Sequence, residues 1–132
     1  MALYVTDTHP LVWYASGQRG KLSKRAIRIF EDADRNTVLV YVPVMVLWEV
    51  SMLIRGRRIE LRQPFDHWVQ GLPRRGFEVV PVDLPLVLEA RWLIFSRDPF
   101  DVSIVATAKL KDLPLITKDE NITGSGEVEV AW

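Results

Sequence analysis

The sequence of 132 residues predicts one α/β domain, a parallel sheet sandwiched between helices. Short apolar runs typical of strands alternate along the chain with segments whose apolar residues recur at helical spacing. Strands separated by helices pair in parallel, because each helical connection returns the chain to the same end of the sheet. In such folds, ligands bind beyond the carboxyl ends of the strands.

Five runs are expected to form the strands, each short and bounded by polar residues, proline or glycine. In chain order they are Ala2–Thr6, Val38–Val42, Phe77–Val82, Leu113–Thr117 and Glu127–Trp132. The second is rich in β-branched residues and is expected to be buried. The last alternates polar and apolar residues, which indicates a strand with one exposed face.

Three helices are expected in the first half of the chain. Pro10 suits the first turn of a short helix, because the N–H groups of that turn have no acceptor, and Gly17 ends it. Ser23 is the expected N-cap of the second helix. Val44–Arg55 is the third.

The second half begins with an arginine-rich segment broken by glycine and proline, in which Phe65–Leu72 places apolar residues at helical spacing. Leu86–Phe95 has one apolar helical face. Asp98 and Pro99 open a further helix as its N-cap and first residue. A loop is expected at Gly124–Gly126, before the last strand.

Four acidic residues on four separate elements form the candidate site. Asp7 follows the first strand and Asp119 lies just past the fourth, so parallel pairing brings both to one edge of the sheet. Glu49 lies in an apolar helix, where an unpaired buried carboxylate is costly or becomes protonated. Asp101 precedes the apolar stripe of its helix and can point toward the same edge.

Each acid also has a structural interpretation, which the sequence leaves open. Glu49 can pair with an arginine of the segment that follows its helix. Asp98 and Asp101 fit the N-cap and N3 positions of a capping box. Asp7 and Asp119 are each typical of turns or helix caps.

Taken together, the acids favour a divalent cation. A cluster of carboxylates repels itself unless a cation lies in it, and oxygen ligands without His or Cys select Mg²⁺ or Mn²⁺ over zinc. Carboxylate-held Mg²⁺ supports phosphoryl chemistry by polarising the phosphate and activating a water. Thr8 and Thr117 lie beside two of the acids and can orient a water or a carboxylate, whereas strand propensity explains Thr6.

Four motifs carry these residues in order: Val5–Trp13, Trp48–Ser51, Asp98–Ala108 and Leu115–Asp119. Their order and spacing resemble the PIN domain family, especially the VapC-type toxins of bacterial toxin–antitoxin pairs. The resemblance covers essentially residues 1–132 as one domain. It implies a parallel α/β/α sandwich and a Mg²⁺- or Mn²⁺-dependent endoribonuclease.

The resemblance also implies roles for individual residues. The acids that would bind metal and act in catalysis, with a metal-activated water attacking the phosphodiester, are Asp7, Glu49, Asp101 and Asp119. Accessory candidates are Asp98, Thr8 and Thr117, of which Asp98 is not carried over as a firm ligand. The family often has a histidine just ahead of its third motif, where this chain has Ser96 and Arg97. The expected partners are an RNA substrate, a second copy of the chain and a small antitoxin whose tail covers the acidic pocket.

The charge balance is compatible with a nucleic-acid substrate. The chain has 17 basic and 17 acidic residues, so four acids assigned to a metal leave 13 others against 17 bases. Two arginine-rich segments supply candidate phosphate-binding residues: Arg19, Lys21, Arg25, Arg55, Arg57 and Arg58. A solvated helix face explains such runs equally well.

Several classes are excluded or disfavoured. The absence of cysteine excludes a disulfide scaffold, a thiolate zinc site and a cysteine nucleophile. The longest nearly apolar run, Val38–Trp48, is shorter than the roughly 20 residues that cross a bilayer, and no signal-peptide pattern is visible, so a cytoplasmic protein is expected. His9 and His67 have no Gly-x-Ser-x-Gly elbow to complete a catalytic triad and are expected at the surface or at caps.

Two other functions remain open. A response-regulator receiver is similar in size, and Asp7 and Lys118 can mimic its acidic pocket and its strand-end lysine. Receivers, however, need a carboxylate at the end of the central strand, whereas Val38–Val42 ends in Pro43. The other is a PIN domain without catalysis that acts as an RNA-binding or interaction module.

Overall fold

Five parallel strands form the central sheet, in the order β3-β2-β1-β4-β5. They are β1 (Ala2–Thr6), β2 (Val38–Pro43), β3 (Phe77–Val80), β4 (Leu115–Ile116) and β5 (Val130–Ala131). The computed structural model describes all residues from 1 to 132. The predicted parallel sheet is confirmed.

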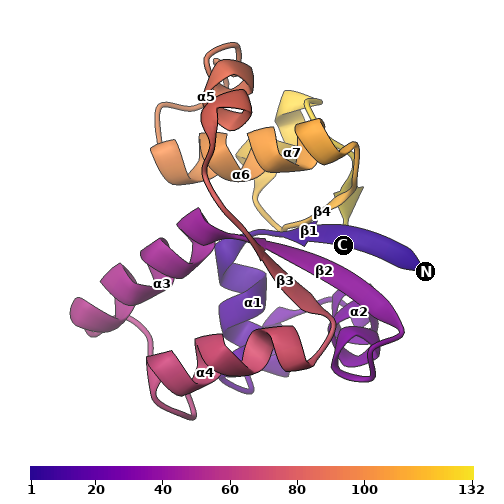
Figure 1. The fold of residues 1–132 in the computed structure, drawn as a ribbon, viewed down its shortest axis with the longest axis vertical. Helices are drawn as coiled ribbons and strands as arrows, with labels where there is room; N and C mark the ends of the chain where they lie inside the picture. Colours follow the sequence, from indigo (N-terminus) through magenta and orange to yellow (C-terminus); the bar gives the residue numbers. More distant parts are fainter.

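Seven α-helices surround this sheet (Figure 1). They are α1 (Thr8–Ala15), α2 (Lys24–Asp34), α3 (Val44–Arg55), α4 (Phe65–Gly71), α5 (Leu84–Ala90), α6 (Pro99–Lys111) and α7 (Glu120–Ser125). Helices α1, α2 and α4 lie on one side of the sheet, and α6 and α7 lie on the other, with α5 packed against α6. The predicted α/β/α sandwich is therefore confirmed, and none of its helices has the length and apolar character to span a membrane.

The direction of the chain connections reverses between β1 and β4. From β1 the chain passes to β2 and β3 on one side, and later returns to β4 and β5 on the other. The neighbours β1 and β4 pair in register through Val5 with Leu115 and Thr6 with Ile116. Such a reversal leaves a crevice beyond the carboxyl ends of the two strands. The order differs from the 2-1-3-4-5 order of receivers, which counts against the receiver interpretation.

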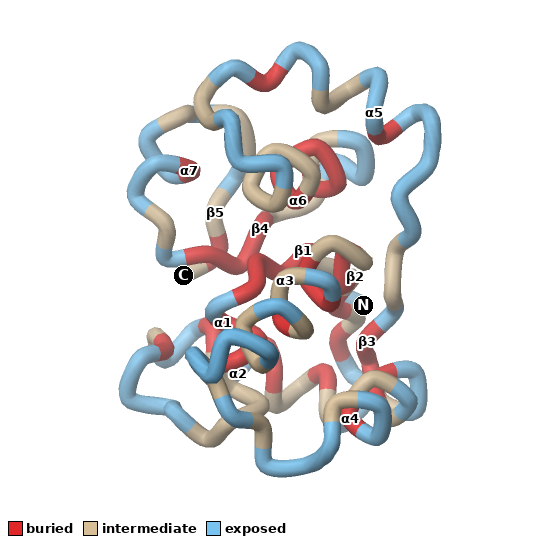
Figure 2. The backbone as a smooth tube through the Cα atoms, turned by 90° about the vertical axis from the view of Figure 1, so that its left-hand side faces the viewer, coloured by how far each residue is buried: buried red, intermediate tan, exposed pale blue.

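One apolar core fills both sides of the sheet, as the buried segments in the middle of Figure 2 show. Val5, Val40 and Ile116 contribute fully buried side chains from three adjacent strands. Helix α3 begins directly where β2 ends, and it contacts both α1 and α6. It therefore joins the two helical layers at the carboxyl edge of the sheet.

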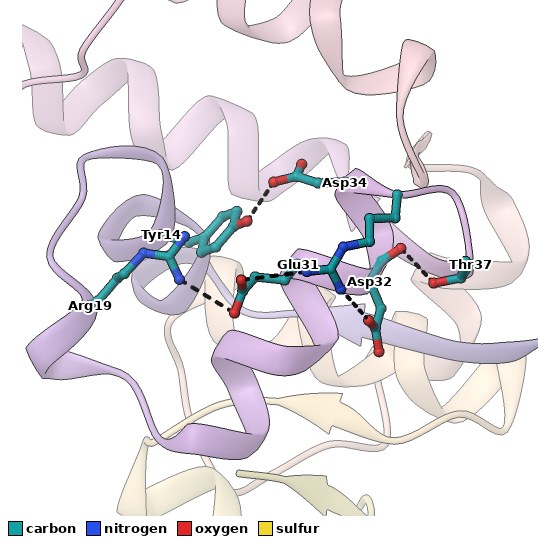
Figure 3. Close-up of polar contacts among 7 residues, drawn as sticks. Tyr14, Arg19, Glu31, Asp32, Asp34 and Thr37 are labelled. Atoms are coloured by element: carbon teal, nitrogen blue, oxygen red, sulfur yellow. Dashed lines mark hydrogen bonds and ion pairs between the residues drawn. The ribbon is translucent and has the colours of Figure 1, made fainter.

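A polar network fixes α1 against α2 (Figure 3). The Tyr14 hydroxyl donates a hydrogen bond to Asp34, which also accepts from Arg75 Nη1 at 2.8 Å. Arg19 lies over the Tyr14 ring and pairs with Glu31 at 3.6 Å. Arg19, one of the predicted phosphate-binding residues, thus contacts the Tyr14 ring and Glu31 within the protein.

Several predicted elements differ in extent. The strand predicted over Phe77–Val82 ends at Val80. The helix predicted over Leu86–Phe95 begins at Leu84, because Asp83 caps it by accepting from the Leu86 N–H at 3.1 Å, and it ends at Ala90. The last two strands are shorter than predicted. Only Leu115–Ile116 and Val130–Ala131 are strand residues there, since these two pairs alone lie opposite each other in register.

The loop predicted at Gly124–Gly126 is wrong in part. Residues 120 to 125 form α7, and Gly126 ends it with a φ of +67°, a left-handed conformation that glycine adopts without strain. Asp119 begins this helix by accepting a hydrogen bond from the Ile122 N–H at 2.9 Å. The N-cap thus decides the local structure despite two glycines in the segment.

Candidate functional site

Asp7 occupies the crevice between β1 and β4. It caps α1, since its Oδ1 accepts the Thr8 N–H at 2.8 Å, and its own N–H donates to the Ile116 carbonyl at 3.0 Å. Its Oδ2 accepts the Thr117 hydroxyl at 2.7 Å. The side chain is buried, and burial raises the pKa of the Asp7 carboxyl above its ordinary value, although the bonds from Thr117 and Thr8 oppose that shift.

Asp119 lies on the β4 side of the same crevice. The Thr117 hydroxyl accepts the Asp119 N–H at 3.0 Å while it donates to Asp7. The carboxylate of Asp119 caps α7 through one oxygen, and its charge contributes to the raised pKa of Asp7. The expected meeting of Asp7 and Asp119 at one sheet edge is therefore found, and Thr117 orients both.

Glu49 reaches the site from the middle of α3. It is half-buried and takes part in no ion pair, so the structure does not contain the salt bridge considered from the sequence. Burial, followed by the charges of Asp7 and Asp98, raises the pKa of the Glu49 carboxyl. The buried Thr8 hydroxyl faces Glu49 and lowers that pKa, yet no hydrogen bond of ordinary length joins the two side chains.

Asp101 reaches the site from the first turn of α6. The capping box considered from the sequence is not formed, because the Asp98 N–H bonds to Ser96 Oγ at 3.0 Å. Burial, followed in order by the charges of Asp98, Asp7, Asp119 and Glu49, raises the pKa of Asp101 to about 7. The dependence of one pKa on all the other acids indicates that they converge.

Asp98 has a structural role beside this cluster. It is exposed and caps α6, since its Oδ1 accepts the Phe100 N–H at 2.8 Å. Its charge still raises the pKa of Glu49 and of Asp101. The capping interpretation of Asp98 is thus confirmed, and its position leaves it near the four other acids.

No arginine or lysine forms an ion pair with any of these five acids. As the side chains lie, no three carboxylates or histidines are close enough to hold a metal ion together. Mg²⁺ keeps several waters and takes one or two carboxylates directly, so it does not need three converged ligands. The oxygen-only donor set, its mutual repulsion and the Thr8 hydroxyl, which lacks a partner, fit a hydrated divalent cation.

The predicted RNA-binding residues lie on two stretches of the chain, 19–25 and 55–58, and none of them forms an ion pair with the acids. Arg57 and Arg58 line a cavity of about 660 Å³ beyond the end of α3, which Arg55 terminates. Lys21 lies over the Trp13 ring at 5.9 Å, and Arg25 is exposed on α2.

A second cavity, of about 400 Å³, opens directly beside Asp7 and Asp119. His9, Trp13 and Lys118 contribute to its walls. The sequence alone did not single out these three as a group. The sequence feature that could have identified them is the separation of four residues between His9 and Trp13, which places both side chains on one side of a helix that starts at the site.

Comparisons with known proteins agree with this geometry. The sequence model of the PIN domain family matches residues 4–124. No curated protein sequence matches the chain.

Several solved structures have the same fold. VapC20 of Mycobacterium tuberculosis, described as a toxin that cleaves the sarcin–ricin loop, superposes with a TM-score of 0.67 at 17% identity, covering 98% of this chain and 99% of that one. VapBC2 of Rickettsia felis, bound to a DNA fragment from its promoter, gives 0.66 at 12% identity over 97% and 96%. FitAcB of Neisseria gonorrhoeae gives 0.63 at 16% identity over 98% and 96%. Identities this low show similarity of fold.

Proposed function

This chain belongs to the PIN domain family, and we propose on that premise that it is a Mg²⁺- or Mn²⁺-dependent endoribonuclease, the toxin of a VapBC-type toxin–antitoxin pair. One observation carries the proposal. Asp7, Glu49, Asp101 and Asp119 come from four separate elements to the crevice at the strand reversal, and none is neutralised by a base. A structural role alone does not explain this uncompensated charge.

The chain's own residues would position a divalent cation and its waters. Asp7 is held by the Thr8 N–H and by the Thr117 hydroxyl, so its carboxylate is fixed before any ligand binds. Glu49 and Asp101 reach the crevice from two different helices, α3 and α6. A cation bound there supplies polarisation of the phosphodiester and a water acidic enough to act as nucleophile near neutral pH.

The same acidic residues are the candidates for proton transfer. The pKa of Asp101 is about 7 without a cation, which is close to the value at which a carboxylate both accepts and releases a proton at neutral pH. The Thr8 hydroxyl is buried without a partner, and it is available to donate to a water or to a phosphate oxygen. These features favour hydrolysis of a phosphodiester over simple binding.

RNA is the proposed substrate, and a small antitoxin is the proposed partner. The VapC20 structure is described as that of a cleaving toxin, and other relatives of this fold were solved as toxin–antitoxin complexes. The exposed basic side chains on α2 and after α3 would contact RNA phosphates away from the cleavage site.

We also propose a homodimer. The apolar segment Phe65–Leu72 is unsuitable as an interface, because its Trp68 and Leu72 are buried in the core. Helix α5 and the loop after it expose Leu84, Val87, Leu88, Trp92 and Ile94, the last to 94%. An exposed apolar patch of this kind is typical of a surface that a partner covers, and a second copy of the chain is the proposed partner.

The test is cleavage of total cellular RNA by the purified chain with Mg²⁺, with Mn²⁺ and with EDTA, followed by mapping of the new ends. We expect discrete ends that require the cation. Binding of RNA without new ends would instead support the PIN domain without catalysis.

A further inference from the structure

The cavity of about 400 Å³ beside the acids has the size of a small-ligand site, and its lining is mostly polar and charged. Six of the residues that line it are Asp7, His9, Trp13, Lys118, Asp119 and Glu120. We propose that this cavity is a nucleoside subsite, which takes the base of the nucleotide next to the scissile phosphate. The inference rests on the proposed RNA cleavage and names the part of the substrate that the site reads.

Two aromatic side chains form one wall. His9 and Trp13 lie one turn apart on α1, with ring centroids 5.9 Å apart and planes tilted by 50°. Trp13 is half-buried and is braced edge-on by Trp132, whose ring centroid is 6.4 Å away, whereas His9 is exposed. A braced indole beside an exposed imidazole offers a rigid surface on which a base stacks, and stacking accepts every base.

Two charged side chains complement the aromatic wall. Lys118 is exposed and forms no ion pair, although it immediately precedes Asp119. Its ammonium group is suited to a phosphate that flanks the base. Glu120 is exposed at the start of α7, and its carboxylate accepts N–H donors from the edge of a base. The cavity therefore combines the three contacts that a nucleotide needs.

The location ties the subsite to the cut. Asp7 and Asp119 line the cavity and also belong to the acidic cluster, so the two sites share a wall. A phosphate held at the acids places an adjoining nucleoside at the mouth of the cavity. Because stacking accepts every base, the expected preference at this position is the one that Glu120 imposes, for bases that offer an N–H donor.

The variants to compare are Trp13→Leu, His9→Ala and His9→Phe, with His67→Ala as the control. His67 is an exposed histidine on α4 that does not line the cavity. His9→Phe keeps an aromatic ring but removes the titratable group that lowers the pKa of Asp7 and Glu49. Trp13→Leu keeps an apolar side chain against Trp132 but removes the stacking surface.

The substrate is a short oligoribonucleotide that contains one mapped cut site. We expect Trp13→Leu and His9→Ala to raise KM roughly 5- to 100-fold, with a smaller change in kcat. His67→Ala should keep KM within about twofold of wild type. His9→Phe should raise KM less than His9→Ala does, because it keeps a ring on which the base can stack. Circular dichroism shows whether Trp13→Leu is folded. If Trp13→Leu is unfolded, His9→Ala still decides the test, because His9 is exposed and its replacement should not disturb the fold.

An abasic nucleotide placed in turn at each position beside the cut completes the test as a double-mutant cycle. At one position, the abasic substrate should raise KM for wild type but add no further loss in Trp13→Leu or His9→Ala. If the abasic nucleotide and the substitution each raise KM and the two effects multiply at every position, the subsite is overturned. It is also overturned if KM is unchanged in both Trp13→Leu and His9→Ala. A wild-type chain that cleaves no RNA at all overturns the proposed function itself, which separates the two failures.

Discussion

The Thr117 hydroxyl joins the two strands that flank the crevice, because it donates to Asp7 Oδ2 at 2.7 Å and accepts the Asp119 N–H at 3.0 Å. One buried side chain thus fixes the carboxylate of Asp7, which follows β1, and the backbone of Asp119, which lies a few residues past β4. The positions of Asp7 and Asp119 both depend on the Thr117 hydroxyl. Removing this hydroxyl is therefore the most direct test of how the site is built.

Thr117→Val should destabilise the protein and slow RNA cleavage. The substitution keeps the shape but leaves Oδ2 of the buried Asp7 carboxylate without its donor, which costs about 1–3 kcal/mol of unfolding free energy. Thr117→Ser should recover most of both losses. Urea denaturation and kcat/KM are the measurements.

Thr8→Val is the matched control for stability. The Thr8 hydroxyl is buried without a hydrogen-bond partner, so its removal should leave the unfolding free energy within about 0.5 kcal/mol of wild type or raise it. Cleavage should still fall, because the lost hydroxyl faces the site. Equal destabilisation by Thr117→Val and Thr8→Val would contradict the assigned bonding.

Asp7→Asn and Asp101→Asn should each abolish cation-dependent cleavage while the far-UV circular dichroism stays that of wild type. Each change removes a charge from the acidic cluster and keeps the side-chain volume. Asp98→Asn is the control, since asparagine caps a helix about as well as aspartate. Cleavage that persists in both Asp7→Asn and Asp101→Asn would remove the catalytic assignment.

Local signals in the sequence were sufficient for the sheet and for most helix starts. Ser23 and Asp98 cap their predicted helices, and parallel pairing was enough to bring Asp7 to Asp119. The sequence did not predict α7, because Gly124 within it and Gly126 directly after it outweighed the capping signal of Asp119.

Long-range placement was beyond the sequence. The arginines after α3 were candidate partners for Glu49, yet Arg62 packs over Gly17, and Arg57 lines another cavity. The bracing of Trp13 by Trp132 joins the two ends of the chain, and only the completed sheet brings them together. The candidate acids could thus be named from the sequence. Their lack of ion pairs and the cavity beside them could not be predicted from it.

Val87→Asp should convert the proposed dimer to a monomer in analytical ultracentrifugation. Val87 is 54% exposed on α5, so a charge there weakens apolar association without disturbing the core. Met52→Asp on α3 is the comparison, because Met52 is similarly exposed at 49% and lies on a helix that also exposes an apolar side chain, Trp48, to 61%. A monomer from Met52→Asp alone would move the interface to α3.

Glu49→Gln should raise the melting temperature of the protein in EDTA by a few degrees. The charged form of Glu49 is disfavoured by burial and by the charges of Asp7 and Asp98, and the amide removes that repulsion. Because the side chain is half-exposed, solvent screening limits the gain. In Mg²⁺ the gain should vanish or reverse, since glutamine is a poorer ligand. A lower melting temperature in EDTA would instead indicate that Glu49 stabilises the fold as a charge.

The cation-free protein should lose stability as the pH rises through the range set by Asp101. Its pKa is about 7 when folded, against an ordinary value of 3.8, so the folded state binds the proton more tightly than the unfolded state. The stability that this proton confers is present at acidic pH, decreases as the pH rises from about 4 to 7, and is absent above that range. Asp101→Asn should therefore stabilise the protein more at pH 8 than at pH 5, as measured by urea denaturation of both proteins in EDTA. Mg²⁺ should reduce this pH dependence in wild type, because the cation takes the place of the proton. The same difference between the two proteins at both pH values would show that the carboxyl of Asp101 is not held in the acidic cluster.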